Sequence, residues 1–242
     1  MNTPCLKRYK KLKSTNTFVL ENFDGLKTGD VVIADVQTSG RGRFDRVWEG
    51  SSPENIYMTF VIKPENITDF PFVNLTQYLS VVLNRILNRD FEIKSNIKWP
   101  NDILCDGKKL SGILAEGKAT GGTFKGVALG VGINVNCDLS IFDELPQASS
   151  ISVVLGKRID KEEFLRNIVN EFFRDFEEFS KRGFALIADE YKKMCKFNKT
   201  VKISASANDG VYKFDALNSD GTLSVTDEKG KKITIVNGDI LC

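Results

Sequence analysis

The sequence predicts an α+β protein in which a mixed layer of strands and helices is followed by a small all-β unit. Strand-like and helical patterns are mixed over residues 1–195. After residue 196, short apolar runs are separated by turn signals such as Asn-Asp-Gly and Ser-Asp-Gly. Four or five short antiparallel strands at this spacing indicate a small barrel. A unit of under about 50 residues is marginal alone, so we expect 196–242 to pack on the main domain.

The strands of the main domain are predicted from runs of β-branched and aromatic residues. We expect them at 29–37, 55–63 and 123–135. The segment 97–118 is expected to form two further strands, because Asp106-Gly107 inside it is a hairpin turn signal.

Two helices are predicted from apolar residues at helical spacing. The first covers 71–90 and opens with a proline, which is favoured at a first helical position. The second covers 159–183, where Asp160 can cap the start and Gly183 can end the helix. The basic residues near the N-terminus are interpreted as a solvated helix end or arm; they are Lys7, Arg8, Lys10, Lys11 and Lys13.

Composition excludes several kinds of chemistry. The 242 residues include no histidine, which removes Ser-His and Cys-His nucleophilic catalysis and most transition-metal sites. Five scattered cysteines without a Cys-x-x-Cys pair are typical of a reducing cytosol. The net charge of +2 is small for a nucleic-acid-binding domain. We expect a cytoplasmic protein, because neither a run of about 18 apolar residues nor a secretory signal occurs.

The segment TSGRGRFDRVW, residues 38–48, concentrates positive charge on a pliable backbone. Arg41, Arg43 and Arg46 repel one another unless an anion neutralises them, and guanidinium groups bind phosphate oxygens bidentately. The glycines let backbone N–H groups approach the same oxygens. Trp48 offers a ring face for stacking or apolar packing. On spacing alone, the pattern is equally typical of a loop that binds a phosphorylated ligand and of a flexible or RNA-contacting surface loop.

Three other signals are weak when each is taken alone. Lys109 either faces solvent or supplies a cation that stabilises charge in acyl transfer. Asp102, in the segment KWPNDIL, either belongs to an Asx turn or acts as a metal contact or proton acceptor. GVGIN at 130–134 does not match a dinucleotide fingerprint, and no G-x-x-x-x-G-K-[ST] phosphate loop occurs.

Taken together, the motifs resemble those of the biotin protein ligases, also called biotin–[acetyl-CoA-carboxylase] ligases. The resemblance covers nearly the whole chain, and its motifs are highly specific as a set. It implies a mixed-sheet catalytic domain of the biotin/lipoate ligase type at 1–195 and an SH3-like β-barrel at 196–242. The matching segments are KSTN (13–16), VQTSGRGRFDRVW (36–48), NIYMT (55–59), KWPNDI (98–103), KKLSGILAE (108–116), GVGINV (130–135) and KRIDKEEFL (157–165).

The resemblance also implies a reaction. Biotin and ATP would form biotinyl-5′-adenylate and pyrophosphate, with Mg²⁺ entering as MgATP and no metal held by the protein alone. A lysine of a biotin carboxyl carrier protein domain, part of a biotin-dependent carboxylase, would then accept the biotin. The STN motif begins at residue 14, so we expect the monofunctional type without a DNA-binding domain. Neither a DNA nor a membrane partner is expected, and homodimer formation is left open.

Site residues follow from the matched motifs. The resemblance implies catalytic roles for Lys109, Arg43 and Asp102. It implies a biotin site formed by Ser14, Thr15, Asn16, Gln37, Gly40, Arg41, Gly42, Arg43, Lys109 and Gly112. It implies an adenylate site formed by Arg43, Arg46, Trp48, Asn101, Lys109 and Asn134.

The chain departs from the family pattern at two positions and leaves two alternatives open. Lys13 stands where an acidic residue is usual, and Pro53 falls later after Trp48 than expected. Lipoate and octanoate ligases share the general fold and chemistry, although the full GRGRxxRxW pattern favours biotin. A nucleic-acid module based on the arginine-glycine loop is the second alternative, and the small net charge argues against it.

Overall fold

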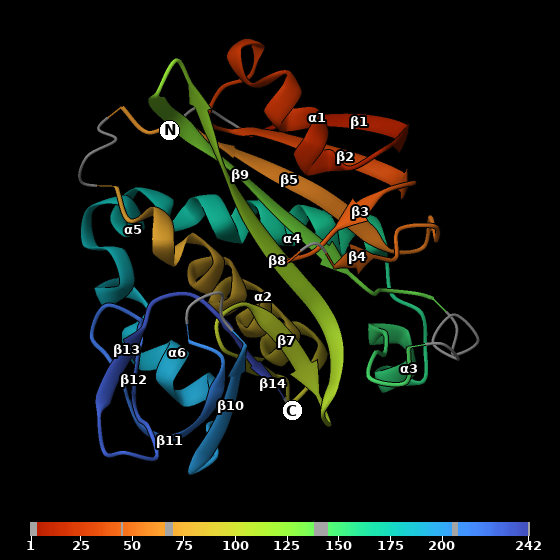
Figure 1. Ribbon diagram of the computed structural model, residues 1–242. Helices are drawn as coiled ribbons and strands as arrows, with labels where there is room; N and C mark the ends of the chain where they lie inside the picture. Colours follow the sequence, from red (N-terminus) through yellow and green to blue (C-terminus); the bar gives the residue numbers. More distant parts are fainter. Residues whose placement is uncertain (1–3, 45, 66–69, 138–144, 205–207, 242) are drawn as a thin grey trace.

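A seven-stranded mixed sheet forms the centre of the computed structural model (Figure 1). Only β1 and β2 run parallel, and all other neighbours are antiparallel. In spatial order the strands are β1 (Cys5–Leu12), β2 (Asp30–Gln37), β5 (Ile56–Ile62), β9 (Thr123–Ile133), β8 (Lys108–Thr120), β7 (Asp102–Cys105) and β6 (Asn96–Lys98). The structure describes residues 4–44, 46–65, 70–137, 145–204 and 208–241.

The two faces of this sheet bury two different cores. Successive side chains of a strand point to opposite faces, and in β2 Val31 and Ile33 join the large core while Val32 joins the small one. Helix α1 (Thr15–Glu21) and η1 (Phe23–Gly25) cover the small core. The large core lies under η2 (Phe72–Asn74), α2 (Leu75–Phe91), α4 (Lys161–Arg174), α5 (Phe176–Arg182), η4 (Gly183–Leu186) and α6 (Ala188–Met194).

Most local predictions are confirmed. The strands expected at 29–37, 55–63 and 123–135 are β2, β5 and β9. Asp106 and Gly107 both have positive φ, 48° and 77°, and join β7 to β8 as a tight hairpin. The first predicted helix is α2, preceded by the short η2 turn.

The predicted helix at 159–183 begins and ends where expected but is broken once. Asp160 caps α4 by accepting hydrogen bonds from the backbone N–H groups of the next turn, and Gly183 ends α5 with a φ of 55°. At Asp175 the backbone leaves the helical region, with φ −105° and ψ 2°. Phe176 continues the apolar stripe on α5, so the break leaves the core intact.

The interpretation of the basic N-terminal run as a helix end or arm is wrong, because all of these residues except Lys13 lie in β1. The strand pairs with β2 from Cys5 to Leu12. Tyr9 and Leu12 pack against the small core, and the Tyr9 ring lies 4.6 Å from that of Phe18. Pairing with a buried strand and the apolar contacts of Tyr9 and Leu12 are sufficient here, even though most of the other positions are basic.

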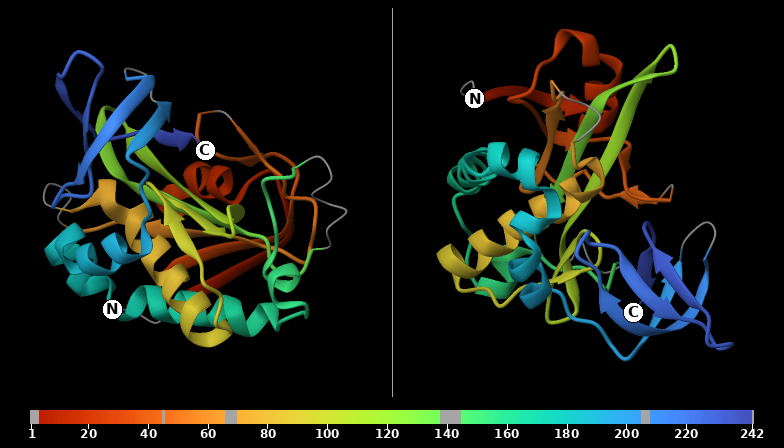
Figure 2. Two further views of the ribbon diagram at one scale, coloured as in Figure 1. Left: turned by 90° about the horizontal axis from the view of Figure 1, so that it is seen from below. Right: turned by 90° about the vertical axis from the view of Figure 1, so that its left-hand side faces the viewer.

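The C-terminal residues form a five-stranded antiparallel sheet beside the helical layer (Figure 2). The order β13-β12-β11-β10-β14 confirms the predicted short strands, but within the described residues no pairing joins β13 to β14, so barrel closure is not shown. No helix in the described ranges is long and apolar enough to span a membrane. The strands are β10 (Thr200–Ser204), β11 (Gly210–Leu217), β12 (Leu223–Thr226), β13 (Lys232–Ile235) and β14 (Asp239–Leu241).

Candidate active site

A cavity of about 310 Å³ opens where β7, β8 and β9 approach the start of α1 and the C-terminal strand β14. Its volume is that of a small-molecule site. Of the fifteen residues that the motifs predict for the site, only Gly40 does not line it. Gly40 instead pairs with Trp48 in the short β3–β4 hairpin (Gly40–Arg41 and Val47–Trp48), where a Cβ would collide with the Trp48 carbonyl oxygen.

One end of the cavity is a neutral, hydrogen-bonding floor. Gln37 Oε1 accepts hydrogen bonds from the backbone N–H of Thr15, at 2.8 Å, and from its hydroxyl, at 3.1 Å. Thr59 Oγ1 donates to Asn16 Oδ1 at 2.7 Å. Ser14 is the N-cap of α1, but its side chain makes no capping hydrogen bond. All five side chains are buried, so their orientations are fixed by the protein.

Glycines bring the backbone of β8 and β9 close to this floor and to Trp48. A Cβ at Gly130 would collide with the Asn16 side chain, and one at Gly132 would collide with the Trp48 ring. A Cβ at Gly112 would lie 3.0 Å from both Lys109 and Trp48. Trp48 Nε1 is buried and has no hydrogen-bond partner among the described residues. The glycine run that was weak as a sequence signal therefore makes room for Asn16 and Trp48.

The other end of the cavity is positively charged. Arg41 and its neighbours extend from the β3–β4 hairpin, in which Gly42 N donates to Arg46 O at 2.7 Å. Arg41 pairs with Glu116 at 2.9 Å, and Arg43 and Arg46 both pair with Asp239. Burial lowers the pKa of Arg43, and the Asp239 and Asp102 carboxylates oppose that effect.

Lys109 faces the cavity and is held by Asp102. The two side chains form an ion pair with Nζ and Oδ1 2.7 Å apart, and Nζ lies 5.5 Å from the centre of the Trp48 ring. The Lys109 backbone is fixed separately, because its N–H donates to Gln147 O and its carbonyl accepts from Ser149. The prediction that Lys109 faces solvent is therefore disfavoured.

The two predicted asparagines have structural hydrogen bonds at the rim. Asn101 donates to the Ile113 carbonyl and accepts from Arg43 Nη1 at 3.2 Å. Asn134 donates to Ser149 O at 3.0 Å. Each has a further acceptor lone pair that a ligand can use, and their ligand contacts stay predictions.

Several residues that line the site or contact its side chains were not assigned from the sequence, and four of them are polar or charged partners of the predicted residues or of the cavity. Thr59, Lys98 and Glu116 end or open matched motifs, so they were within reach of motif reasoning. Asp239 lies in no matched motif and had no such signal. Within the described residues no cluster of three or more His, Cys, Asp or Glu side chains could hold a metal ion.

The cavity is shaped for an elongated ligand with a neutral polar head and an anionic end. Its described lining contains five basic side chains and three acidic ones, so positive charge is in excess. The mixed sheet, the glycine-rich β9 and this cavity together define a catalytic domain of the biotin and lipoate ligase class. The chain belongs to the biotin/lipoate A/B protein ligase family, whose sequence profile matches residues 9–134.

Comparisons with individual proteins agree with this membership. The chain is 36% identical over 164 residues to the bifunctional ligase/repressor BirA of Bacillus subtilis. This alignment covers 66% of this chain and 49% of the relative. The chain thus spans about half the length of that relative. It is 26% identical over 226 residues to the biotin–[acetyl-CoA-carboxylase] ligase of Paracoccus denitrificans, covering 91% of this chain and 93% of that protein.

A solved structure has the same architecture over almost the whole chain. The biotin protein ligase of Aquifex aeolicus in complex with biotin and ATP superimposes with a TM-score of 0.81 at 26% identity. The match covers 98% of this chain and 97% of that one. The expected fold of the catalytic domain, and the position of a β unit at the C-terminus, are therefore confirmed.

Proposed function

We propose that this chain is a biotin protein ligase, which activates biotin with ATP and transfers it to a lysine of a biotin carboxyl carrier protein. The observation that carries the proposal is the cavity itself, which joins a neutral polar floor to a cationic mouth in one continuous space. Biotin has a neutral ureido head and a carboxylate tail, and it matches both ends. The similar proteins named above act as further support.

The floor would hold the ureido head. Thr15, Asn16 and Gln37 present hydroxyl and amide groups already fixed by mutual hydrogen bonds. Leaving a buried polar group of the head unpaired would cost about 1–3 kcal/mol. A floor with fixed donors and acceptors therefore selects a ligand with matching polar atoms and disfavours the purely apolar dithiolane ring of lipoate.

In the first half-reaction a carboxylate oxygen of biotin attacks the α-phosphorus of ATP. The new oxygen–phosphorus bond forms as the bond to pyrophosphate breaks, and pyrophosphate leaves with the electron pair. Lys109 would contact both the carboxylate and the α-phosphate, while Arg43 and Arg46 would neutralise phosphate charge. The protein mainly positions two anions against their mutual repulsion.

Magnesium enters this proposal as part of MgATP. The described residues hold no acidic cluster for it, so phosphate oxygens would be its main ligands. When bound, it would screen the phosphate charge.

In the second half-reaction the neutral amine of the carrier lysine attacks the acyl carbon of the adenylate. A carbon–nitrogen bond forms, the carbon–oxygen bond to phosphate breaks, and AMP leaves. The amine must lose a proton, and Asp102 at the cavity mouth is our assignment for the group that accepts it. Its pairing with Lys109 at 2.7 Å holds its carboxylate at the cavity, which both residues line.

The finer structural and cellular expectations belong to the same proposal. The C-terminal sheet would curl as an SH3-like barrel, with 1–195 and 196–242 as its two domains. The protein would act in the cytoplasm, and either as a monomer or as a homodimer. The described cysteines form no disulfide, which is in keeping with a reducing compartment.

Incubation with biotin, MgATP and a biotin carboxyl carrier domain tests the proposal directly. The intact mass of the carrier should rise by one biotinoyl group, and the rise should require both biotin and ATP. Lipoate replaces biotin in a parallel reaction. A mass increase with lipoate alone would assign the chain to the lipoate branch of the family, and no increase with either acid would refute the proposal.

A further inference from the structure

Asp239 joins the C-terminal sheet to the arginine-bearing hairpin. It lies on β14, where Ser204 of β10 pairs opposite it, and only 12% of its side chain is exposed. Its Oδ1 lies 2.8 Å from Arg43 Nη1, and its Oδ2 lies 2.7 Å from Arg46 Nη1. One carboxylate therefore uses its two oxygens to neutralise two arginines of the cavity mouth.

Arg43 is oriented almost entirely by this end of the chain. Besides Asp239 it donates to the Gly238 carbonyl at 3.0 Å and to the Asn237 side chain. Its side chain is only 16% exposed, so its positive charge is costly to bury without a charged partner. Within the described residues, Asp239 is the carboxylate that forms an ion pair with Arg43.

The C-terminal sheet is held in place by a second contact that does not involve the arginines. The buried Trp99 donates from Nε1 to Gly221 O at 3.0 Å, and Gln77 Nε2 donates to the same carbonyl at 2.8 Å. Gly221 has a φ of 83°, and a Cβ there would lie 2.5 Å from Gln77 Oε1. This close, glycine-dependent turn fixes the sheet on α2, so the position of Asp239 does not depend on the hairpin that it contacts.

From these contacts we infer that Asp239 is a positioning residue of the active site. It holds Arg43 and Arg46 side by side over the cavity and thereby makes the C-terminal sheet part of the site. Both guanidinium groups lie against the Phe44 ring, at 5.1 and 5.9 Å from its centre, so they are close enough to repel. Without the carboxylate, the guanidinium groups of Arg43 and Arg46 move apart.

The first test needs no assumption about substrate. Asp239→Asn keeps the size of the side chain and removes its charge. In limited trypsin digestion of the protein without added ligand, followed by mass spectrometry, cleavage after Arg43 should become about tenfold faster, which is the lower end of the loss expected for a hydrogen bond to a charged group. Asp215→Asn is the matched control, because Asp215 lies in the same sheet and bonds to Thr226 outside the cavity.

A second variant breaks one of the two ion pairs of Asp239 from the hairpin side. Arg46→Gln leaves the pair between Asp239 and Arg43 in place, so cleavage after Arg43 should speed up less than in Asp239→Asn. The double variant should be cleaved as fast as Asp239→Asn, because that change already removes the Arg46 pair. This arm also covers the case in which Asp239→Asn fails to fold. Wild-type cleavage in the single variants, or fully additive effects in the double variant, would overturn the inference.

The third test rests on the proposed function. Enzyme loaded with radiolabelled biotinyl-5′-adenylate is chased with unlabelled ligand, and Asp239→Asn should release the label about tenfold faster. Asp239→Glu should restore retention in part, because it restores the charge. A role confined to stability would lower the melting temperature of Asp239→Asn and leave the release rate unchanged, which would contradict the inference. If the wild-type chain forms no adenylate, the proposed function fails, and the digestion experiments still decide the role of Asp239.

Discussion

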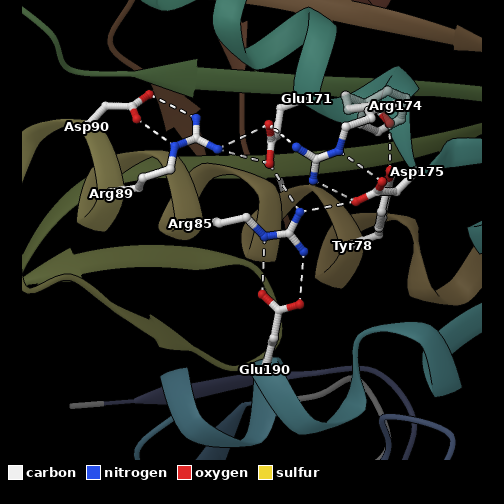
Figure 3. Close-up of polar contacts among 9 residues, drawn as sticks. Tyr78, Arg85, Arg89, Asp90, Glu171, Arg174, Asp175 and Glu190 are labelled. Atoms are coloured by element: carbon white, nitrogen blue, oxygen red, sulfur yellow. Dashed lines mark hydrogen bonds and ion pairs between the residues drawn. The ribbon is translucent and has the colours of Figure 1, made fainter.

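Two groups of three arginines have different roles in this protein. Arg41, Arg43 and Arg46 extend over the cavity from a hairpin whose two strands have two residues each. A second group lies between α2, α4 and α6, where Figure 3 shows Arg85 directed at Glu171, Asp175 and Glu190. The remaining members of the second group are Arg89 and Arg174.

The helical group is electrically satisfied by its own neighbours. Arg85 donates to three carboxylates, and Glu171, only 8% exposed, also accepts from Arg89 and Arg174. Burial lowers the pKa of Arg85, but the hydrogen bonds to Glu190 and Glu171 raise it by more. These side chains are fixed by three helices and serve as a clamp.

The cavity group differs in charge balance and in support. The described lining has more basic than acidic side chains, and the hairpin that bears the arginines is supported mainly by Asp239 and Glu116. Arginines are thus structural where carboxylates match them between rigid elements, and they are available to a ligand where the local charge remains positive. Substitutions at the cavity and in the helical group should therefore have different effects, on activity in the first case and on stability in the second.

The largest effect is expected for Lys109→Ala. In the proposed reaction Lys109 contacts the carboxylate and phosphate, so its removal should reduce biotin-dependent ATP–pyrophosphate exchange by about 10²–10³-fold, as for the loss of one stabilising donor in a transition state. The melting temperature should change little, because Lys109 is partly exposed. Lys108→Ala is the matched control, since Lys108 is exposed and does not line the cavity. Equal losses in the two variants would remove Lys109 from the mechanism.

The next effect is expected for Arg43→Gly. The variant loses the contact to Asp239 and the charge-assisted hydrogen bonds proposed for Arg43 and the ligand, and it should release biotinyl-5′-adenylate about 10–100-fold faster. The reactive adenylate should then label bystander proteins, which can be measured by streptavidin blotting of a mixture with serum albumin. Retention at the wild-type level would show that Arg43 serves the C-terminal sheet alone.

Turns, caps and strands could be predicted because their signals are local, and the cavity residues were assigned because the motifs resemble those of the biotin protein ligases. Turn, cap and strand signals such as Asp106-Gly107 and Asp160 depend on a few neighbouring residues, and the structure confirms them. The motifs likewise placed Asn16 and Lys109 in one cavity.

The features that were not predicted depend mainly on contacts between residues that are far apart in the sequence. Asp239 lies 196 positions from Arg43, and nothing near it in sequence indicates an arginine partner. The break at Asp175 follows from backbone geometry at one residue inside a continuous apolar stripe. The basic run forms β1 because it pairs with β2. This pairing is a contact within the folded sheet, and the local sequence pattern does not show it.

Arg85→Met should break the clamp without affecting the chemistry. Removing the guanidinium takes one partner away from the buried carboxylate of Glu171, and the free energy of unfolding should fall by about 2 kcal/mol. This loss is smaller than the usual cost of breaking a buried pair, because Arg89 and Arg174 still contact Glu171. Urea denaturation measures this loss, and the exchange assay should give wild-type activity. Arg182→Met, which removes an exposed pair with Glu178, should cost under about 0.5 kcal/mol. A similar small cost for Arg85→Met would mean that the network is only a surface feature.

The smallest effect is a pH dependence within the clamp. Hydrogen bonds from Arg174 and Arg85 lower the pKa of Asp175, although its partial burial acts in the opposite direction. A carboxyl group with a lowered folded-state pKa contributes stability above its unfolded pKa of about 3.9, and the contribution is lost as the pH falls through the folded value. Asp175→Asn should therefore destabilise the protein by about 1 kcal/mol or less at pH 7, since the side chain is 30% exposed. In urea titrations between pH 7 and pH 3, the gap between variant and wild type should narrow toward the acid end. A gap of constant size would show that Asp175 acts through the helix break and not through its charge, and the clamp would then lose one of its carboxylates.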